Sequence, residues 1–539
     1  MTVFNIVFVF LFLRTQAVDI DTFPLHIVHY NDFHARFEET SLQFPMCRNN
    51  DTQCLGGFAR LYHEITTLVK AYPETLVLNA GDVFQGTYWY TLLKWNVTQK
   101  FINLLPNDVH AIGNHEFDDG VADLSRYIAT LRAPVVAANI DISDVPSLQG
   151  IIKPHVVVTK NGRNIGVIGL ITTETPIASK SENVKFLDSI PVVEREAKLL
   201  KDKGVDIIIV LSHCGLDVDK EIARTVGENI DVIVGGHTHS LLWNGESPSK
   251  EKVAGPYPIL VEATQGCDHQ VIIVTASSFT KYLGNITVFF DKSGEVVDFE
   301  GSPIFLNRSI PEDPAILSLL QPYKKKLHSL VDEEIGYSNQ ILSDYNCSAH
   351  ECILGNIVAD GCWRATVAKY PTNLTTIAFL LRNNIRSPLP SGKLTRATAL
   401  NIFPFSNELI ALEIQGRYIL EALRKCFSKS YNSVPFSGPW VPQFSGMRIT
   451  VNTTLPRNVA SVLVKRGDVY RPLDPDEVYQ LATLDYFLMG GAGFTMLKEN
   501  SRNPKHVGKM LKVFEDIIKE ISPIDESQHS LDGRLKLIE

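Results

Sequence analysis

The sequence predicts an α/β protein in which two large domains are joined by a helix. The chain has 539 residues, more than one hydrophobic core usually serves. Short β-rich runs alternate with helical stretches from residue 23 to about residue 290, a rhythm typical of α/β sheets. Beyond Pro311 the rhythm ends, and residues 314–334 carry apolar side chains at helical spacing. We expect a leader over 1–17, a first domain over 18–310, a linker helix over 311–335 and a second, α+β domain over 336–539.

The elements of the first domain follow from apolar, β-rich runs between polar segments. We expect strands over 25–30, 75–79, 135–138, 164–170, 206–211 and 231–234, and helices over 58–70 and 191–203. In the linker helix, the lysines at 324–326 lie on one side. We interpret them as a solvated face rather than a binding patch.

The composition excludes several function classes. Lys and Arg number 51 against 60 Asp and Glu, a net charge of −9, so the chain lacks the basic surface of a nucleic-acid binder. Hydrophobic residues at 45% and charged residues at 21% are typical of a folded globular protein. No internal run reaches the roughly 18 apolar residues of a membrane span, and residues 530–539 lack the apolar tail of a GPI signal. We therefore expect no membrane anchor.

Both the N-terminus and the glycosylation motifs point to export. Residues 3–13 are apolar, and Thr15-Gln16-Ala17 follows with small residues where signal peptidase needs them, so we expect cleavage after Ala17. A buried strand or a short anchor is the alternative interpretation of this run. Sequons of the form N-x-S/T agree with secretion, and they lie at Asn50, Asn96, Asn285, Asn307, Asn346, Asn373 and Asn452.

The cysteines predict disulfides that close short loops. Cys47 with Cys54 and Cys347 with Cys352 are close pairs, which in an exported chain are typical of loop disulfides. Sequence alone does not fix the pairing of the other four. Cys362 and Cys426 are candidates for a third bridge. Cys214 and Cys267 are candidate free thiols.

Polar motifs follow several strands of the first domain. They are His29–Arg36 (HYNDFHAR), Asn79–Asp82 (NAGD), Gly113–Asp118 (GNHEFD), Leu211–Gly215 (LSHCG) and Gly235–His239 (GGHTH). Sheets of this class place their ligand crevices at the carboxyl ends of strands. A lone histidine at such a place is usually a packed or capping residue. Together, however, the motifs gather Asp, His and Asn without a basic cluster, an arrangement that is costly unless cations bind. We predict two divalent metals bridged by one carboxylate.

The five motifs resemble those of the metallophosphoesterase domain of the 5'-nucleotidase family, which includes secreted salivary apyrases of blood-feeding arthropods. The resemblance implies an N-terminal metallophosphoesterase domain with an α/β sandwich fold and a C-terminal 5'-nucleotidase-type substrate domain. It also implies a metal-ligand set: Asp32, His34 and His239 for one ion, Asn114, His213 and His237 for the other, and Asp82 bridging both.

The same resemblance implies the catalytic residues and leaves the metal open. His115 matches the family's catalytic histidine, which Asp118 would position and polarise. Asp, His and Asn ligands suit Zn or Mn, and also Fe, by their softness. The resemblance to salivary apyrases suggests Ca or Mg instead.

The second domain departs from the family pattern in its nucleoside site. The family's Asn-Gly-Gly-x-Ile-Arg loop is Leu381–Arg386 (LRNNIR) here, which keeps Arg386 for a phosphate and loses the Asn and both glycines. The family holds the base between two aromatic rings, whose positions we align with Leu409 and Tyr486. Ala492 replaces the Asp that binds the ribose. We therefore expect weakened recognition of base and sugar.

A tripeptide in the second domain, Arg466-Gly467-Asp468, matches the integrin-recognition sequence RGD. Apolar runs flank Gly467, which predicts a hairpin tip. An exposed Arg and Asp on either side of Gly can bridge a partner's carboxylate and metal ion. Most chance occurrences of RGD are inert surface turns, which is the alternative.

Taken together, the sequence predicts a secreted, metal-dependent nucleotide phosphohydrolase of apyrase type. Its substrates would be extracellular ATP and ADP, which signal to platelets, and we expect a monomer. The alternative is an integrin antagonist that uses RGD on an apyrase scaffold, with weak or lost catalysis. A 5'-nucleotidase restricted to AMP is a third hypothesis, disfavoured by the altered nucleoside site.

Overall fold

The computed structural model describes residues 22–42, 44–47, 53–263, 269–343, 346–348, 350–428, 441–454, 458–525 and 529–538. Three sequence predictions lie outside these residues: the signal peptide with its cleavage after Ala17, the sequon at Asn50 and the thiol of Cys267. Among the described residues, no helix combines the length and apolar character that crossing a membrane requires.

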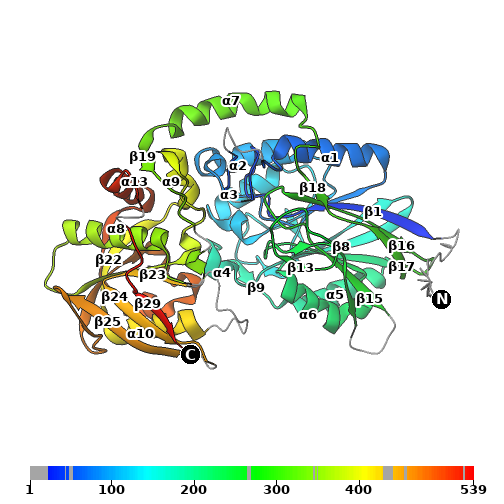
Figure 1. The fold of residues 1–539 in the computed structure, drawn as a ribbon. Helices are drawn as coiled ribbons and strands as arrows, with labels where there is room; N and C mark the ends of the chain where they lie inside the picture. Colours follow the sequence, from blue (N-terminus) through cyan, green and yellow to red (C-terminus); the bar gives the residue numbers. More distant parts are fainter. Residues whose placement is uncertain are drawn as a thin grey trace, which may run out of the picture.

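The N-terminal domain is a sandwich of two mainly parallel sheets, as predicted (Figure 1). The first sheet has the order β17 (Val296–Gly301), β16 (Tyr282–Phe290), β1 (Phe23–Tyr30), β2 (Leu76–Asn79), β3 (Val109–Ala111), β4 (Val135–Val136), β6 (Ile152–Lys153), with β18 (Ile304–Phe305) on β16. The second has the order β14 (Ile259–Glu262), β15 (Gln270–Val274), β11 (Val232–Gly235), β10 (Ile207–His213), β8 (Arg163–Ile171), β7 (His155–Lys160).

Alternation along β1 shows how the layers are held together. Leu25 and Ile27 join the core between the two sheets, whereas Val28 and Tyr30 face a separate core beneath helices, because successive side chains of a strand point to opposite faces.

The helices of this domain are α1 (Phe58–Ala71), α2 (Tyr88–Ile102), α3 (Val121–Thr130), α4 (Thr175–Ala178), α5 (Ser189–Lys201) and α6 (Leu216–Val226), with 3-10 turns η1 (Asn114–Phe117) and η2 (Gly227–Asn229). Short pairs are β5 (Ile140–Asp141) with β9 (Lys185–Phe186) and β12 (Leu241–Leu242) with β13 (Val253–Gly255).

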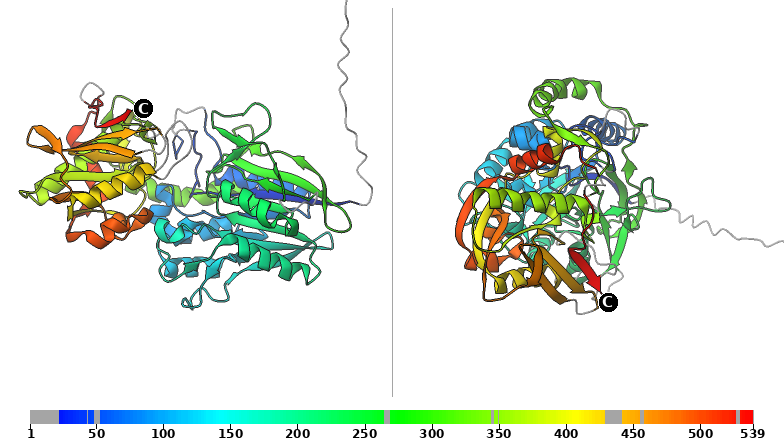
Figure 2. Two further views of the ribbon diagram at one scale, coloured as in Figure 1. Left: turned by 90° about the horizontal axis from the view of Figure 1, so that it is seen from below. Right: turned by 60° about the vertical axis from the view of Figure 1, so that its left-hand side comes forward.

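The predicted linker helix is α7 (Pro314–Val331), which runs along one side of both domains (Figures 1 and 2). Its start is set by Asp313, whose Oδ1 accepts the N–H of Ile316 at 2.9 Å, followed by Pro314 at a position that needs no N–H. Lys324 of the lysine run pairs with Glu38 of the N-terminal domain rather than being only solvated.

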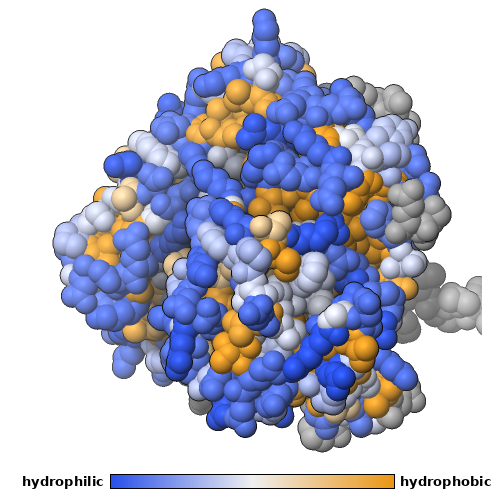
Figure 3. All heavy atoms as spheres, turned by 90° about the vertical axis from the view of Figure 1, so that its left-hand side faces the viewer, coloured by the Kyte–Doolittle hydropathy of each residue, from blue (hydrophilic) through white to orange (hydrophobic). Residues whose placement is uncertain are grey.

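The C-terminal domain mixes helices with mainly antiparallel strands, which confirms the predicted α+β class. One sheet has the order β23 (Pro442–Ser445), β20 (Thr376–Leu381), β27 (Val478–Leu484), β22 (Glu408–Gln415), β28 (Arg502–Lys509), and another β26 (Val469–Pro472), β25 (Asn458–Arg466), β24 (Met447–Asn452), β29 (Leu535–Ile538). The remaining elements are β19 (Glu334–Ser338), η3 (Asn346–Ser348), α8 (Ile353–Lys369), η4 (Arg382–Asn384), β21 (Gly392–Thr395), α9 (Arg396–Ile402), α10 (Gly416–Ser428), α11 (Asp485–Leu488), η5 (Gly491–Gly493), α12 (Thr495–Asn500) and α13 (Met510–Ile521). The end of the molecule that this domain forms is largely hydrophilic, with separate hydrophobic patches (Figure 3).

Two of the expected disulfides form and the third does not. Cys47–Cys54 and Cys347–Cys352 are bonded, with Cα atoms 5.6 and 5.0 Å apart. The candidate bridge between Cys362 and Cys426 is wrong, because both are buried free thiols on different helices. Cys362 of α8 packs against Met510 of α13, with the two sulfur atoms 3.8 Å apart, while Cys426 lies on α10. Cys214 is free and buried, as expected.

Candidate active site

The predicted metal donors converge where parallel strands of both sheets end. β1, β2 and β3 lead into them from the first sheet, and β10 and β11 from the second. Side chains from segments up to about two hundred residues apart therefore meet in one place. Asp32, His34, Asp82, Asn114 and His213 are buried, and His237 and His239 are partly exposed.

One group of donors comprises Asp32, His34 and His239, whose ligand atoms all lie within 4.8 Å of one another. His239 Nε2 is 3.2 Å from Asp32 Oδ1 and 3.2 Å from His34 Nε2. Two imidazoles and a carboxylate at this spacing match the donor set of a divalent transition metal.

A second group comprises Asp82, His213 and His237, again within 4.8 Å. Asp82 Oδ2 lies 3.1 Å from His213 Nε2 and also 3.7 Å from His34 Nε2 of the first group. Asp82 therefore stands between the two groups, where a bridging carboxylate must be. Its other oxygen, Oδ1, accepts the backbone N–H of His115 at 2.9 Å.

The hydrogen-bond pattern around these donors is the one expected of residues that bind metal cations. Asp32 Oδ1, Asn114 Oδ1 and His213 Nε2 are buried and make no hydrogen bond to any described residue, a costly state unless another group is bound. Nδ1 of His34 lies 3.1 Å from the Phe84 carbonyl, and Nδ1 of His213 lies 2.6 Å from that of Ala80. Protons on Nδ1 leave both Nε2 lone pairs free, as in metal-bound histidines.

Several of the same residues have a strained backbone. Positive φ angles occur at Asp32 (49°), His34 (46°), Asp82 (55°), His237 (76°) and His239 (53°). Each left-handed non-glycine residue costs on the order of 1–3 kcal/mol, and such residues cluster at functional sites. Gly113 is required for a different reason, since a side chain there would overlap the Asp82 carboxylate.

His115 and Asp118 form the expected pair. His115 Nδ1 lies 2.7 Å from Asp118 Oδ2, and Ser179 Oγ donates to Asp118 Oδ1 at 2.8 Å, so the carboxylate is fixed from both sides. Burial alone would lower the pKa of His115, but the charges of Asp118 and Asp82 outweigh it and raise the pKa to about 9. The imidazole is therefore a cation near neutral pH and can donate from Nε2 to an anionic oxygen.

Glu116 is a site residue that the sequence interpretation missed. Its buried carboxylate accepts four backbone N–H groups, those of Asp82 (2.9 Å), Val83 (2.7 Å), Phe84 (3.1 Å) and Gly113 (2.5 Å). It thereby joins the loop that carries Asp82 to the loop that carries Asn114 and His115. The only sequence signal was an acidic residue within GNHEFD, because three of its four partners come from another segment, residues 82–84.

Arg386 and Phe405 bring the C-terminal domain to the His115–Asp118 pair. The Phe405 ring stacks on His115, with centroids 5.9 Å apart, and the guanidinium of Arg386 lies 5.6 Å from the centre of the Phe405 ring. Leu409, which we aligned with the first aromatic position, is instead fully buried within β22, paired with Leu484 and Gly508. The ring that reaches His115 is therefore Phe405, whose contact with another domain the sequence does not show.

Tyr486 lies at the contact between the domains. Its hydroxyl donates to the carbonyl of Ile177 in α4, and Gly491 leaves room for its ring. Ala492 is buried with a left-handed backbone (φ 55°). The aromatic ring is thus present, but no carboxylate stands at Ala492.

The RGD tripeptide forms the tip of the β25–β26 hairpin, as predicted. Arg466 pairs with Val469, so Gly467 and Asp468 make a two-residue turn, with φ +60° at Gly467. All three residues are exposed. Arg466 forms an ion pair with Glu477, so its guanidinium is already engaged within the chain.

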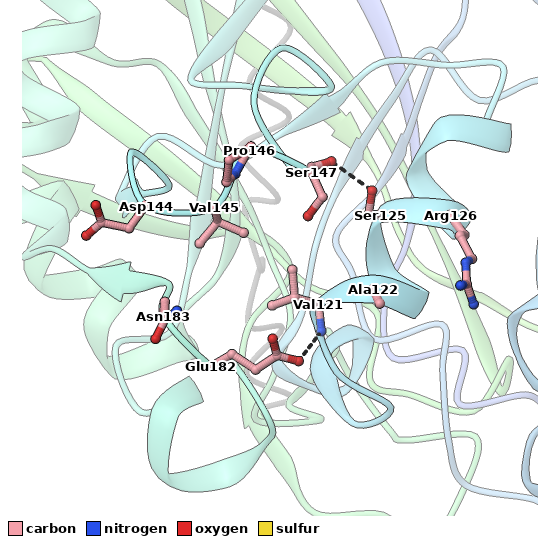
Figure 4. A pocket seen from close by; sticks show the side chains of 10 residues that line it. All are labelled: Val121, Ala122, Ser125, Arg126, Asp144, Val145, Pro146, Ser147, Glu182 and Asn183. Carbon is pink, nitrogen blue, oxygen red and sulfur yellow. Dashed lines mark hydrogen bonds between the residues drawn. The ribbon is translucent and has the colours of Figure 1, made fainter.

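A separate hollow of about 420 Å³ lies between the start of α3 and loops near residues 144–147 and 182–183 (Figure 4). Glu182 there accepts the N–H of Val121 at 2.9 Å, which caps the helix. None of the predicted metal donors lines this hollow. The site is therefore assigned by its donor atoms rather than by the size of a cavity.

Comparison with known proteins identifies the family. The calcineurin-like phosphoesterase model matches residues 25–241, and the 5'-nucleotidase C-terminal domain model matches residues 334–499. An apyrase of Tabanus yao is 37% identical over 532 residues, covering 96% of this chain and 94% of the relative. The 5'-nucleotidase of Rattus norvegicus is 32% identical, covering 96% and 91%. The chain belongs to the 5'-nucleotidase family.

Solved structures agree with this membership. The crystal structure of a 5'-nucleotidase precursor from Thermus thermophilus has a TM-score of 0.86 and 32% identity, covering 96% of this chain and 99% of that one. As a member of the 5'-nucleotidase family, the chain is a phosphohydrolase with the two-domain architecture of the family. Its metallophosphoesterase domain makes it a metal-dependent nucleotide phosphohydrolase.

Proposed function

We propose that this protein is a secreted apyrase that removes terminal phosphates from extracellular ATP and ADP. The observation that supports this most is the pair of donor groups that meet at Asp82 beside His115. Loss of extracellular ADP would inhibit platelet aggregation. Secretion rests on the apolar leader, the sequons and the two disulfides.

We assign the donors as follows: Asp32, His34 and His239 to one metal, Asn114, His213 and His237 to the other, and Asp82 to both. Two bound divalent ions would supply a nucleophilic water near neutral pH and neutralise phosphoryl charge. The metal would be Zn, Mn, Ca or Mg, a choice that these ligands leave open.

The chain's own residues orient the substrate and donate hydrogen bonds to it. Protonated His115, fixed by Asp118, donates to a phosphoryl oxygen and stabilises the charge that develops in the transition state. Arg386 binds the phosphate chain, and the rings of Phe405 and Tyr486 border the nucleoside side. Without a carboxylate at Ala492, the ribose loses a charge-assisted hydrogen bond of roughly 1.5–3 kcal/mol. The loss of this bond favours recognition of the nucleotide through its phosphates.

The test is phosphate release from ATP, ADP and AMP after chelation and addition of each metal in turn. We expect release from ATP and ADP that depends on added metal, and none from an Asp82→Asn variant. Metal-dependent release from AMP alone would replace the apyrase proposal with a 5'-nucleotidase. Full activity in Asp82→Asn would remove the two-metal assignment.

A second candidate function rests on the exposed RGD hairpin tip. Integrin binding by Arg466, Gly467 and Asp468 would add platelet inhibition that is independent of hydrolysis. An Asp468→Glu variant should compete less well with fibrinogen for platelet integrin while it keeps its phosphate release. Equal competition by the variant would assign the tripeptide to the hairpin turn alone.

A further inference from the structure

The loop between β15 and β16, residues 275–281, passes from the second sheet to the first beside the first group of metal donors. Three of its non-glycine residues have a left-handed backbone: Ser277 (φ 55°), Phe279 (φ 63°) and Thr280 (φ 58°). Such conformations are costly and persist where the surrounding structure imposes them, often at functional sites. No residue of this loop belongs to either donor group, so its conformation needs another explanation.

Hydrogen bonds join this loop to the segments that carry two of the donors. The N–H of Phe279 donates to the carbonyl of Asp32 at 2.8 Å. The N–H of Ser277 donates to the carbonyl of Ser240, the residue after His239, at 3.1 Å. The loop therefore connects the donor segment that follows β1 of the first sheet with the donor segment that follows β11 of the second.

The ring of Phe279 packs against both imidazoles of the first donor group. Its centroid lies 4.9 Å from that of His239, with the planes inclined by 80°, and 5.4 Å from that of His34, with the planes inclined by 54°. Edge-to-face contacts of aromatic rings are favourable at these distances. The guanidinium of Arg36 lies over the Phe279 ring, with its carbon 4.2 Å from the ring centre, a cation–π contact that helps to fix the ring.

His239 depends on this ring more than His34 does. Nδ1 of His34 lies 3.1 Å from the Phe84 carbonyl, the kind of hydrogen bond that orients a metal-binding histidine. Within the described ranges no carbonyl or carboxylate bonds to Nδ1 of His239, whose two close polar contacts both involve Nε2. The side chain of His239 is also 30% exposed. Packing against Phe279 is thus the contact that limits rotation of this imidazole.

We propose that Phe279 is a positioning residue for the metal ion assigned to the first donor group, because its ring holds the imidazole of His239 in the orientation that metal binding requires. This inference rests on the proposed function. The second donor group has a different support, since Nδ1 of His213 lies 2.6 Å from the Ala80 carbonyl. Loss of the Phe279 ring should therefore weaken the binding of one ion and spare the other.

The experiment is a calorimetric titration of the chelated protein with Zn²⁺ and with Co²⁺. We expect Phe279→Ala to weaken one of two binding steps by about tenfold or more, and the other by less than about threefold. A His239→Ala variant identifies the step of the first ion, because it lacks one proposed ligand of that ion. Phe279→Tyr keeps an aromatic ring and should recover the wild-type affinity. Phe279→Leu keeps most of the apolar volume and should weaken the same step, which serves if Phe279→Ala does not fold.

Phe23→Ala is the matched control. Phe23 is also partly exposed, packs against an aromatic ring (Phe290) and lies near a guanidinium (Arg163), but it stands at the opposite end of β1 from the donors. The visible absorption of bound Co²⁺ depends on the geometry of its ligands. We therefore expect the spectrum to change in Phe279→Ala and to stay as in wild type in Phe23→Ala.

The outcomes separate positioning from ordinary packing. Equal weakening of both ions in Phe279→Ala, unchanged affinity for both, or the same loss in Phe23→Ala would overturn the proposal and leave Phe279 as a packing residue. If wild type binds two ions but hydrolyses no nucleotide, the proposed function fails, whereas selective loss of one ion in Phe279→Ala would still support the positioning role. A wild type that binds no metal would overturn both.

Discussion

The ring of Phe405 lies over the ring of His115, with centroids 5.9 Å apart and planes inclined by 19°. One residue belongs to the C-terminal domain and the other to the N-terminal domain, so the environment of the proposed catalytic histidine is completed only when the domains are together. Thr91 of α2 supports the same contact, because its hydroxyl donates to the carbonyl of Pro404 at 3.2 Å.

Removing that ring should reduce catalysis without unfolding the protein. Stacked aromatic pairs contribute about 0.5–1.5 kcal/mol beyond buried area, so Phe405→Ala should lower kcat/KM for ADP by about two- to tenfold. Phe405→Tyr keeps the stack and serves as the control. Wild-type kcat/KM in Phe405→Ala, with an unchanged melting temperature, would show that the stack is incidental.

Glu116→Gln should loosen the metal centre. The carboxylate accepts four N–H groups from two loops, whereas an amide has only one acceptor oxygen, so at least one loop loses its anchor. Outer groups of this kind change metal affinity by about 10- to 100-fold. Calorimetric metal titration of the chelated protein measures the change, and Glu228→Gln, in the distant turn η2, is the matched control. An unchanged metal Kd would limit Glu116 to a role in folding.

The fold and the grouping of the candidate metal donors could be predicted from sequence because both follow from local patterns. Runs such as residues 25–30 and 58–70 bury apolar side chains at the period of their element and appear as β1 and α1 within two residues. The candidate donors could be named because residue types that bind metals follow strands in short motifs. What escaped prediction depends on distant partners: Glu116 with the Asp82 loop, Phe405 with His115, and the separate helices of Cys362 and Cys426.

Asp118→Asn should shift the pH dependence of catalysis. The Asp118 charge helps to raise the pKa of His115, and in the proposed mechanism protonated His115 is the form that donates to the phosphoryl oxygen. Without that charge the histidine loses its proton at lower pH, so the basic limb of the kcat/KM profile for ADP should move to lower pH. Ser179→Ala, which removes the other contact of Asp118 but not its charge, should move the limb less. A limb at the same pH in Asp118→Asn would mean that another group controls it.

Two buried histidines away from the metal donors should make the protein acid-sensitive. Burial lowers the pKa of His29 to about 3 and that of His110 to about 4, against about 6.5 in the unfolded chain. Above pH 6.5 both histidines are neutral in the folded and in the unfolded chain, so they cost no unfolding free energy. As the pH falls below 6.5, only the unfolded chain takes up the proton, so each histidine costs about 2 kcal/mol of unfolding free energy by pH 5.

Urea unfolding at pH 7.5 and pH 5.0 measures this effect. His110→Gln retains an acceptor for the side-chain amide of Asn79, which lies 3.0 Å from His110 Nδ1, but it cannot be protonated. The variant should therefore lose less unfolding free energy than wild type between the two pH values, by about 2 kcal/mol. His350→Gln, at an exposed histidine, should follow the wild-type slope. If His110→Gln loses stability as steeply as wild type, buried neutral His110 does not contribute to the acid sensitivity.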